Sequence, residues 1–167
     1  MSSCGGFCIG GYIMHVELIR ASMKDAETIW KMQHIAFAEL LERYQDYDVN
    51  PGNEPLEKVQ WRLALPATYF YFIQVDGKNA GAICVIDYHD ETPKKISPLF
   101  VMPEYRGKGV AQQALQAVEN IHGSTNWQLD TILQEKGNCH LYEKMGYRQT
   151  GEIRIINDKM TLVFYKK

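Results

Sequence analysis

Residues 100–115 read FVMPEYRGKGVAQQAL, where an apolar stretch passes through a glycine-rich turn into a helical pattern. Gly107 and Gly109 alternate there with the cations Arg106 and Lys108. Because glycine loses more freedom on folding than any other residue, two glycines here indicate a backbone that a ligand must approach closely. The first N–H groups of a helix are unpaired and carry about half a positive charge. The stretch therefore predicts an anion site, with a diphosphate as its natural occupant.

The spacing of these glycines excludes two common phosphate-binding motifs. It fits neither the P-loop pattern G-x-x-x-x-G-K-[ST] nor the dinucleotide pattern G-x-G-x-x-G. Taken alone, a solvated turn with incidental charge is an alternative interpretation of the same residues.

The flanking sequence predicts one α/β domain with a mixed sheet. Alternating or β-branched apolar residues predict strands at 15–22, 68–75, 80–88, 96–102 and 127–133, and a closing hairpin about Asn157-Asp158. Helical periodicity predicts helices from a Ser22–Asp25 capping box to Tyr44, from 56 to before Pro66, and over 108–122 and 138–145. Pro98 lies inside the strand at 96–102, which predicts an edge strand, a bulge or a broken ladder.

Composition restricts the partners and the compartment. The 167 residues carry a net charge of −2, which gives a nucleic-acid partner no electrostatic support. No stretch reaches the ~20 apolar residues of a membrane span, so we expect no membrane partner. The cysteines Cys4, Cys8, Cys84 and Cys139 complete no metal site and suggest no disulfide framework. A reducing, cytoplasmic location is therefore the expectation.

The first thirteen residues, MSSCGGFCIGGYI, lack the basic segment of a signal peptide. The strand pattern begins near His15. We therefore predict a tail over residues 1–13, flexible or not native to the protein, and a functional domain over residues 14–167.

Two motifs resemble those of the GCN5-related N-acetyltransferase (GNAT) superfamily. Residues 106–111, RGKGVA, match its [QR]-x-x-G-x-[GA] motif between a strand and a helix, and residues 141–147, LYEKMGY, resemble its LYEKxGF signature. The order of predicted elements over residues 15–166 is also similar. The resemblance implies a single-domain GNAT-like fold, with a mixed, mostly antiparallel sheet whose central strands splay apart between flanking helices.

The resemblance also implies a cofactor site and one catalytic residue. The backbone at Arg106, Gly107, Lys108, Gly109, Val110 and Ala111 would hold the pyrophosphate of acetyl-CoA. The strand at Leu99, Phe100 and Val101 would hydrogen-bond the pantetheine arm. Tyr142 would be the general acid that protonates the departing thiolate, although a core tyrosine is the alternative interpretation.

Two positions depart from the family pattern. Glu135 and Asn138 stand where many relatives carry Asn and Ala, and the role of Glu135 is left open. Asn138 is either a cofactor contact or a helix N-cap. Many relatives also carry a Glu base on the strand that here reads ISPLFV, which has no carboxylate.

The general base is therefore not identified by the motifs. One candidate is a water chain. The other is a cluster at a strand end, which we expect at the cleft or its rim and which contains Asp87, His89 and Glu91. The acidic loop with Asp46, Asp48 and Glu54 could attract a cationic amine. A solvated strand end and a solvated loop are the alternatives. The other histidines, His15, His34, His122 and His140, show no ligand spacing.

The function these observations predict is an N-acetyltransferase that moves an acetyl group from acetyl-CoA to a primary amine of a small molecule or peptide by direct transfer. The alternative is a non-catalytic acyl-CoA-binding or sensor domain. Modification of an RNA-associated target is disfavoured by the net charge of −2. The sequence leaves a homodimer open.

Overall fold

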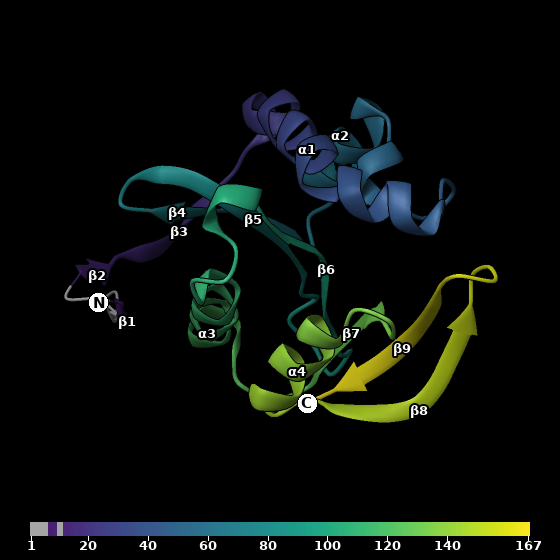
Figure 1. The fold of residues 1–167 in the computed structure, drawn as a ribbon. Coiled ribbons are helices and arrows are strands. Elements are labelled where there is room, and N and C mark those ends of the chain that lie inside the picture. The colour runs from purple at the N-terminus through teal and green to yellow at the C-terminus, as the bar shows by residue number, and fades with distance from the viewer. Residues whose placement is uncertain (1–6, 10–11) are drawn as a thin grey trace.

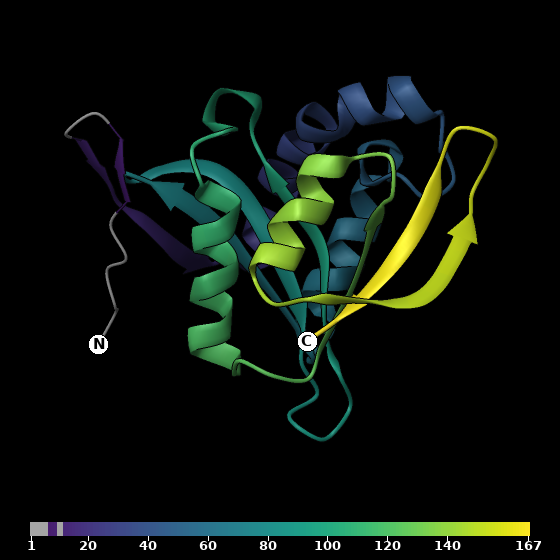
Figure 2. The same cartoon turned by 60° about the horizontal axis from the view of Figure 1, so that its bottom comes forward.

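A computed structural model describes residues 7–9 and 12–167 and contains a seven-stranded sheet between two pairs of helices (Figures 1 and 2). The sheet has the order β3-β4-β5-β6-β7-β9-β8. Its strands are β3 (Val16–Arg20), β4 (Thr68–Val75), β5 (Lys78–Ile86), β6 (Lys94–Val101), β7 (Trp127–Ile132), β8 (Arg148–Ile155) and β9 (Thr161–Lys166). The helices are α1 (Ala26–Tyr44), α2 (Leu56–Ala64), α3 (Val110–His122) and α4 (Lys136–Lys144), with 3₁₀ turns at Met23–Asp25, Pro51–Asn53 and Pro103–Tyr105.

The predicted elements are present, with their ends shifted by a few residues. The capping box before α1 is confirmed, because the Ser22 backbone N–H donates to Asp25 Oδ2 at 2.9 Å. Helix α2 ends at Ala64, before Pro66, and the closing hairpin turns about Asn157-Asp158 as expected. The apolar stripe of α1 is buried at the spacing that places residues on one helix face, at Ala26, Ile29, Met32 and Ala36.

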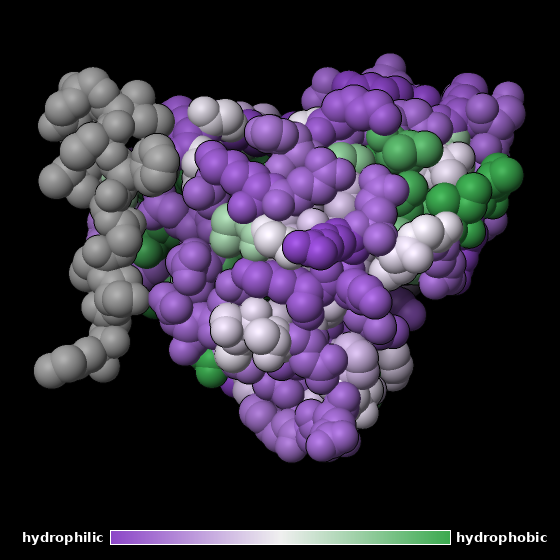
Figure 3. All heavy atoms as spheres, turned by 90° about the horizontal axis from the view of Figure 1, so that it is seen from below, coloured by the Kyte–Doolittle hydropathy of each residue, from purple (hydrophilic) through white to green (hydrophobic). Residues whose placement is uncertain are grey.

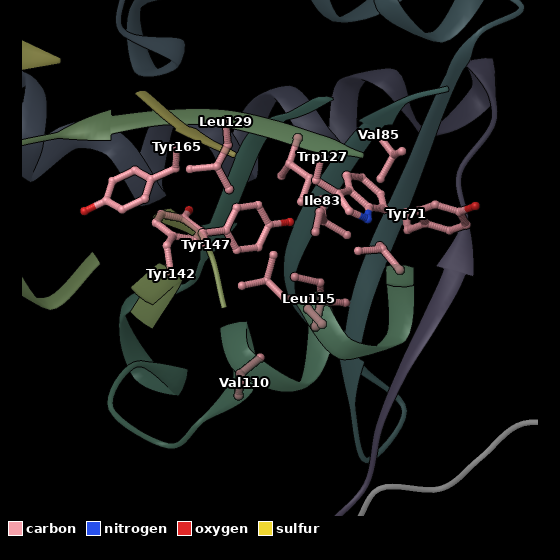
Figure 4. Packing of buried hydrophobic residues seen from close by; sticks show 14 of the residues in the cluster. Tyr71, Ile83, Val85, Val110, Leu115, Trp127, Leu129, Tyr142, Tyr147 and Tyr165 are labelled. Carbon is pink, nitrogen blue, oxygen red and sulfur yellow. The ribbon is translucent and has the colours of Figure 1, made fainter. Parts of the chain in front are cut away.

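Two hydrophobic clusters lie on the two faces of the sheet. Strand β5 contributes to both, because Ile83 and Val85 pack toward α3 while Ala82 and Cys84 pack toward α1 and α2. A strand buried on both faces has a continuous apolar sequence, which explains AGAICVI at residues 80–86. Figure 4 shows the cluster beside α3 and α4, where aromatic side chains fill much of the space.

The centre of the sheet is split. Strands β6 and β7 are parallel and pair only at Lys94↔Trp127 and Lys95↔Gln128, whereas every other neighbouring pair in the seven-stranded sheet is antiparallel. The prediction of a mostly antiparallel sheet with splayed central strands is therefore confirmed. The alternative that Pro98 marks an edge strand is wrong, because β6 is central. The bulge is confirmed, since the β5–β6 register shifts between Ile83 and Val85, opposite the proline that has no N–H to donate.

The segment predicted as a tail contains two short strands. β1 (Phe7–Ile9) and β2 (Tyr12–Met14) form a separate antiparallel pair beside the main sheet (Figure 1). Met14 is buried in the cluster near α3. Cys4 lies outside the described residues. Within the described part of the chain, no helix is both long and apolar enough to cross a membrane.

Gly81 sets how closely β5 and β6 approach each other. A Cβ atom at Gly81 would lie 2.2 Å from the Phe100 carbonyl oxygen, so Gly81→Ala must displace β6. We expect the free energy of unfolding to fall by about 1–3 kcal/mol, the usual cost of overpacking, when measured by urea denaturation. Gly137→Ala is the matched control, because its Cβ meets no atom within 4 Å inside α4 and should leave stability unchanged or higher. Equal stability of Gly81→Ala and wild type would contradict this packing.

Candidate active site

A cavity of about 570 Å³ opens where β6 and β7 separate. Its walls come from α1, β6, the turn before α3 and helix α4. Ten of the eleven residues that were predicted to bind the cofactor or to act as the acid line it, namely Leu99, Phe100, Val101, Arg106, Gly107, Gly109, Val110, Ala111, Asn138 and Tyr142. Two motifs about thirty residues apart in the sequence therefore meet in one cavity.

The glycine-rich turn presents bare backbone to this cavity. Gly107 and Gly109 have positive φ angles of 73° and 78°, which L-residues with side chains rarely adopt. A Cβ at either position would meet no protein atom within 4 Å. Helix α3 begins at Val110, and within the described part of the chain it has no side-chain cap on its first N–H groups. The helix N-terminus is thus an open set of donors with partial positive charge.

The two cations of the turn have different surroundings. The Arg106 guanidinium donates to the Ala36 carbonyl at 2.6 Å and to the Val101 carbonyl at 3.0 Å, and it lies 3.6 Å from Glu39. Arg106 therefore ties the turn to α1 and β6. Lys108 is not among the residues that line the cavity, and its Nζ lies 5.9 Å from the centre of the Tyr105 ring.

Leu99, Phe100 and Val101 form the wall on the β6 side. Their pairing with β5 is complete, but beyond Lys95 the opposite edge of β6 has no ladder partner on β7. Backbone N–H and C=O groups along such an edge can bind an extended ligand in the manner of an added strand.

Tyr142 belongs to a cluster of three tyrosines beside α4, with Tyr147 and Tyr165 at ring-centroid distances of 5.9 and 6.1 Å (Figure 4). The Tyr165 hydroxyl donates to Glu143 at 3.1 Å and accepts from Gln149. The Tyr147 hydroxyl is buried and has no hydrogen-bond partner among the residues that the structure describes. Of the three, only Tyr142 lines the cavity.

Burial raises the pKa of the Tyr142 phenol well above its usual value, and the charge of Asp130 and the Cys139 thiol add to this effect. The low polarity around the ring disfavours the phenolate. Tyr142 therefore stays protonated throughout the neutral and mildly alkaline range.

Glu135 and Asn138 lie together at the start of α4. Helix α4 begins at Lys136 with Glu135 in the N-cap position, so the alternative that Asn138 is the N-cap is wrong. Asn138 lines the cavity instead. Glu135 accepts hydrogen bonds from the Arg43 guanidinium and, at 2.8 Å, from the Tyr44 hydroxyl. It thereby joins the C-terminal end of α1 to α4 at the cavity wall.

The expectation that Asp87, His89 and Glu91 face the cleft is wrong. They follow β5 at the end where Ile86 pairs with Lys95, whereas the cavity lies toward the other end of β6. None of the three lines it. The reason is that β5 and β6 are antiparallel, so the end of β5 meets the start of β6.

Asp87 instead holds a buried histidine. His122 Nδ1 lies 2.8 Å from Asp87 Oδ2, and His122 Nε2 lies 2.8 Å from the Tyr71 hydroxyl. Burial would raise the pKa of Asp87, but hydrogen bonds from His89 and His122 bring it below its usual value. His122, which sequence spacing treated as ordinary, is thus part of a structural polar chain.

The acidic loop is also largely engaged within the protein. The Glu54 carboxylate accepts hydrogen bonds from both terminal nitrogens of the Arg62 guanidinium, at 2.6 and 2.5 Å. Asp46 is buried and accepts from the Asn50 side chain at 3.0 Å. Only Asp48 of the three acidic residues is exposed without such a contact among the described residues. This loop is therefore not a cluster of free charge.

Sequence reasoning missed the surroundings of two acids, Glu135 as an α1 partner on the cavity wall and Asp130 on β7, which is exposed and does not line the cavity. Asp130 was the polar position in the alternating sequence WQLDTIL. That alternation shows that Asp130 leaves the core, but it does not show what lies on the other face of the strand.

A family model described as the acetyltransferase (GNAT) family matches residues 30–147. No curated protein matches the sequence significantly.

Solved structures of low sequence identity share the fold. The ribosomal-protein-S18-alanine N-acetyltransferase from Escherichia coli has a TM-score of 0.70 at 12% identity, covering 90% of this chain and 91% of that one. The spermidine N-acetyltransferase from Vibrio cholerae, in complex with CoA and spermine, has a TM-score of 0.70 at 15% identity, covering 90% of this chain and 93% of that one. An acetyltransferase from Salmonella typhimurium that modifies the N-terminal serine of ribosomal protein L7/L12 has a TM-score of 0.69 at 15% identity, covering 90% of this chain and 92% of that one.

Proposed function

The chain belongs to the acetyltransferase (GNAT) family, and on that premise we propose that it moves an acetyl group from acetyl-CoA to a primary amine of a small molecule or peptide by direct transfer. One observation carries the proposal: the bare α3 N-terminus, the unpaired β6 edge and Tyr142 line a single cavity. That arrangement offers N–H donors for a diphosphate, a strand edge for an extended amide arm and a proton donor for a thioester.

In this proposal the N–H groups at residues 107–111 bind the pyrophosphate of acetyl-CoA. The β6 edge at Leu99, Phe100 and Val101 binds the pantetheine arm, and Asn138 contacts it from α4. Arg106 holds the turn in place through Ala36 and Val101, because its guanidinium is already bonded there. Lys108 adds only long-range positive charge from the turn.

The chemistry requires three groups. Backbone N–H groups of β6 polarise the thioester carbonyl, so that oxygen carries the developing negative charge against fixed dipoles. The amine nitrogen attacks the carbonyl carbon, and the C–S bond then breaks with its electron pair on sulfur. Tyr142 donates its phenolic proton to that sulfur, and the proton that the newly bonded nitrogen loses restores the phenol.

Steady-state turnover of acetyl-CoA, followed by release of free thiol with a panel of polyamines, amino sugars and peptide amines, tests the proposal. We expect acceptor-dependent thiol release and an acetylated product by mass spectrometry. A protein that binds acetyl-CoA tightly but acetylates no acceptor would instead support the sensor domain, and a protein that does not bind acetyl-CoA would contradict both.

We further propose a cytoplasmic homodimer. Cys84 and Cys139 are both free, which suits a reducing compartment. The edge strand β8 is exposed along its whole length and presents Ile153 and Ile155, 59% and 72% exposed. Figure 3 shows hydrophobic residues on the side of the molecule where the β8–β9 hairpin lies. A single monomeric species in sedimentation velocity at high protein concentration would contradict the dimer.

We propose that the catalytic domain spans residues 14–167. The support is that β2 pairs with β1 alone, while Met14 is buried in the core. Deletion of residues 1–13 should therefore change the free energy of unfolding by no more than about 0.5 kcal/mol, as for changes that touch no buried feature. A larger loss in thermal or urea denaturation would place the boundary earlier in the chain.

A further inference from the structure

A second cavity, of about 380 Å³, lies between the end of α2 and the sheet. Its floor comes from the start of β4 and the end of β5, and its walls come from the last turn of α2, the link from α2 to β4 and the residues after β5. Within the described part of the chain, it shares no lining residue with the cavity that contains Tyr142.

The end of α2 creates this cavity. Pro66 disfavours a helical conformation for the residue before it, so α2 stops at Ala64 and the chain enters β4 at Thr68. Helix α2 buries Val59 completely, about one turn before its end. The space between the end of the helix and the strands below it is the cavity.

Three side chains of the floor point to the same face of the sheet. Thr68 pairs with Ile86, and Phe70 pairs with Cys84, in the β4–β5 ladder. Residues directly opposite each other in an antiparallel pair lie on one face. Because Phe70 and Cys84 pack in the cluster beneath α1 and α2, Thr68 and Ile86 also face this side.

The Thr68 hydroxyl is a buried polar group without a protein partner. Thr68 is 4% exposed, and its backbone groups are bonded, the N–H to the Leu65 carbonyl at 3.0 Å and the carbonyl to Arg20 at 3.4 Å. Its hydroxyl has no hydrogen bond to any residue that the structure describes. A buried hydroxyl without a partner costs free energy, and a hydroxyl can both donate and accept. A polar group of a molecule in the cavity can therefore bond to it.

The cavity offers no free charge. Among the described lining residues Arg62 carries the one permanent charge, and both terminal nitrogens of its guanidinium donate to the Glu54 carboxylate. The Arg62 side chain is only 15% exposed, so this charge is neutralised inside the protein. Burial raises the pKa of the Cys84 thiol to about 12, which keeps the thiol neutral. These surroundings favour a neutral molecule over a phosphate or an ammonium ion.

Two aromatic side chains line the cavity while remaining open to solvent. Trp61 of α2 is 53% exposed, and Tyr88 after β5 is 59% exposed. Lys58 lies one turn before Trp61, with its Nζ 4.6 Å from the centre of the indole ring, a cation–π contact that restrains the ring. Exposed aromatic rings at an apolar cavity favour a ligand that is itself aromatic.

We propose that this cavity binds a small, neutral aromatic molecule with one hydrogen-bonding group. The ring of the ligand contacts Trp61 and Tyr88, and its polar group bonds to the Thr68 hydroxyl. The volume is within the range of about 300–1,000 Å³ of small-molecule sites, which are mostly apolar with a few placed polar groups. Since an engineered apolar cavity of about 150 Å³ binds benzene, a molecule with two fused rings fits here. The ligand differs in charge from acetyl-CoA and from a cationic amine, so this site is separate from acetyl transfer.

The test is an NMR titration of the ¹⁵N-labelled full chain with two probes, indole and indene. Indene has nearly the shape of indole but lacks the N–H group that would donate to the Thr68 oxygen. We expect saturable shifts of the amides at Ala67, Thr68 and Tyr88, and none at Gly107 and Gly109. Indole should bind about five- to tenfold more tightly than indene, which corresponds to one hydrogen bond.

Variants separate the hydroxyl from the aromatic wall. Thr68→Val should bind the two probes equally, Thr68→Ser should keep the preference for indole, and Thr131→Val, at a buried threonine that lines neither cavity, should match wild type. Trp61→Ala should weaken both probes about tenfold. Tyr47→Ala is its control, because Tyr47 is 56% exposed and also lines neither cavity.

Three results would overturn the proposal. The first is the absence of saturable shifts around Thr68, or shifts at Gly107 and Gly109 in their place. The second is equal affinity of wild type for indole and indene, a comparison that stands even if Thr68→Val does not fold. The third is a preference for indole that persists in a folded Thr68→Val protein. Calorimetry with acetyl-CoA should give the same affinity with and without saturating indole, and a competitive loss would place the probe in the other cavity.

Discussion

Replacement of Tyr142 by phenylalanine is expected to lower kcat by about 10²–10⁴, the usual contribution of general acid catalysis. The ring packs against Tyr147 and Tyr165 in a buried cluster, and phenylalanine keeps that packing. Because the hydroxyl of Tyr142 has no hydrogen bond to another described residue that would be broken, acetyl-CoA affinity and stability should change little. The loss should therefore fall on kcat and leave the cofactor Kd nearly unchanged.

Burial raises the pKa of the phenol, whereas a thiol in water has a pKa near 8.5. A phenol with the higher pKa gives its proton to such a thiolate only weakly. The comparison changes inside the protein, because burial destabilises a thiolate as well. The same chain shows the effect at Cys84, where burial raises the pKa of the thiol to about 12. A thiolate formed beside the buried Tyr142 ring also loses part of its hydration and becomes more basic, which favours its acceptance of the phenolic proton.

The pH dependence gives a second readout of this role. The acid is active while protonated, so activity is lost only as pH rises through the pKa of the phenol. Burial raises that pKa, which moves the alkaline loss above pH 10. We expect no loss attributable to Tyr142 between pH 7 and 10 in wild type, measured as kcat with saturating acceptor. A Tyr142→Phe enzyme within threefold of wild type would return Tyr142 to a packing role.

The fold was accessible from the sequence because local patterns and long-range packing agree. Burial of Ala26, Ile29 and Met32 on one face of α1 follows directly from their spacing. Pro98 shows where this reasoning stops. A strand proline permits an edge or a bulge, and only the neighbouring strands decide between them. Here β5 and β7 flank it, so the proline accompanies a bulge in a central strand.

In the candidate site, too, some residues could be predicted from local sequence and others could not. Gly107 and Gly109 act through their own backbone, so a short local motif was sufficient to locate them. Carboxylates act across space, and their place depends on strand direction. The antiparallel pairing of β5 with β6 carries Asp87 away from the cavity, while Glu135 at the start of α4 lies on the cavity wall. No sequence spacing distinguishes these two outcomes.

Replacement of Gly109 by valine is expected to weaken acetyl-CoA binding about 100-fold, or ~2.7 kcal/mol. The added Cβ meets no protein atom within 4 Å, so the obstruction acts on a ligand in the cavity rather than on the fold. The side chain would stand over the first N–H groups of α3, each of which can give a charge-assisted hydrogen bond of about 1.5–3 kcal/mol to a phosphate oxygen. Loss of one or two such bonds accounts for the expected change.

Valine at a φ of 78° also strains the backbone, and this strain must be separated from the effect on binding. Gly77 provides the matched control, because its φ is 80°, its Cβ would also meet no atom within 4 Å, and it lies in the β4–β5 turn away from the cavity. Gly77→Val and Gly109→Val should lose similar stability in urea, because each places valine at nearly the same unfavourable positive φ. Only Gly109→Val should lose affinity in calorimetry with acetyl-CoA. Unchanged affinity in Gly109→Val, or an equal loss in both variants, would show that the α3 N-terminus does not hold the diphosphate.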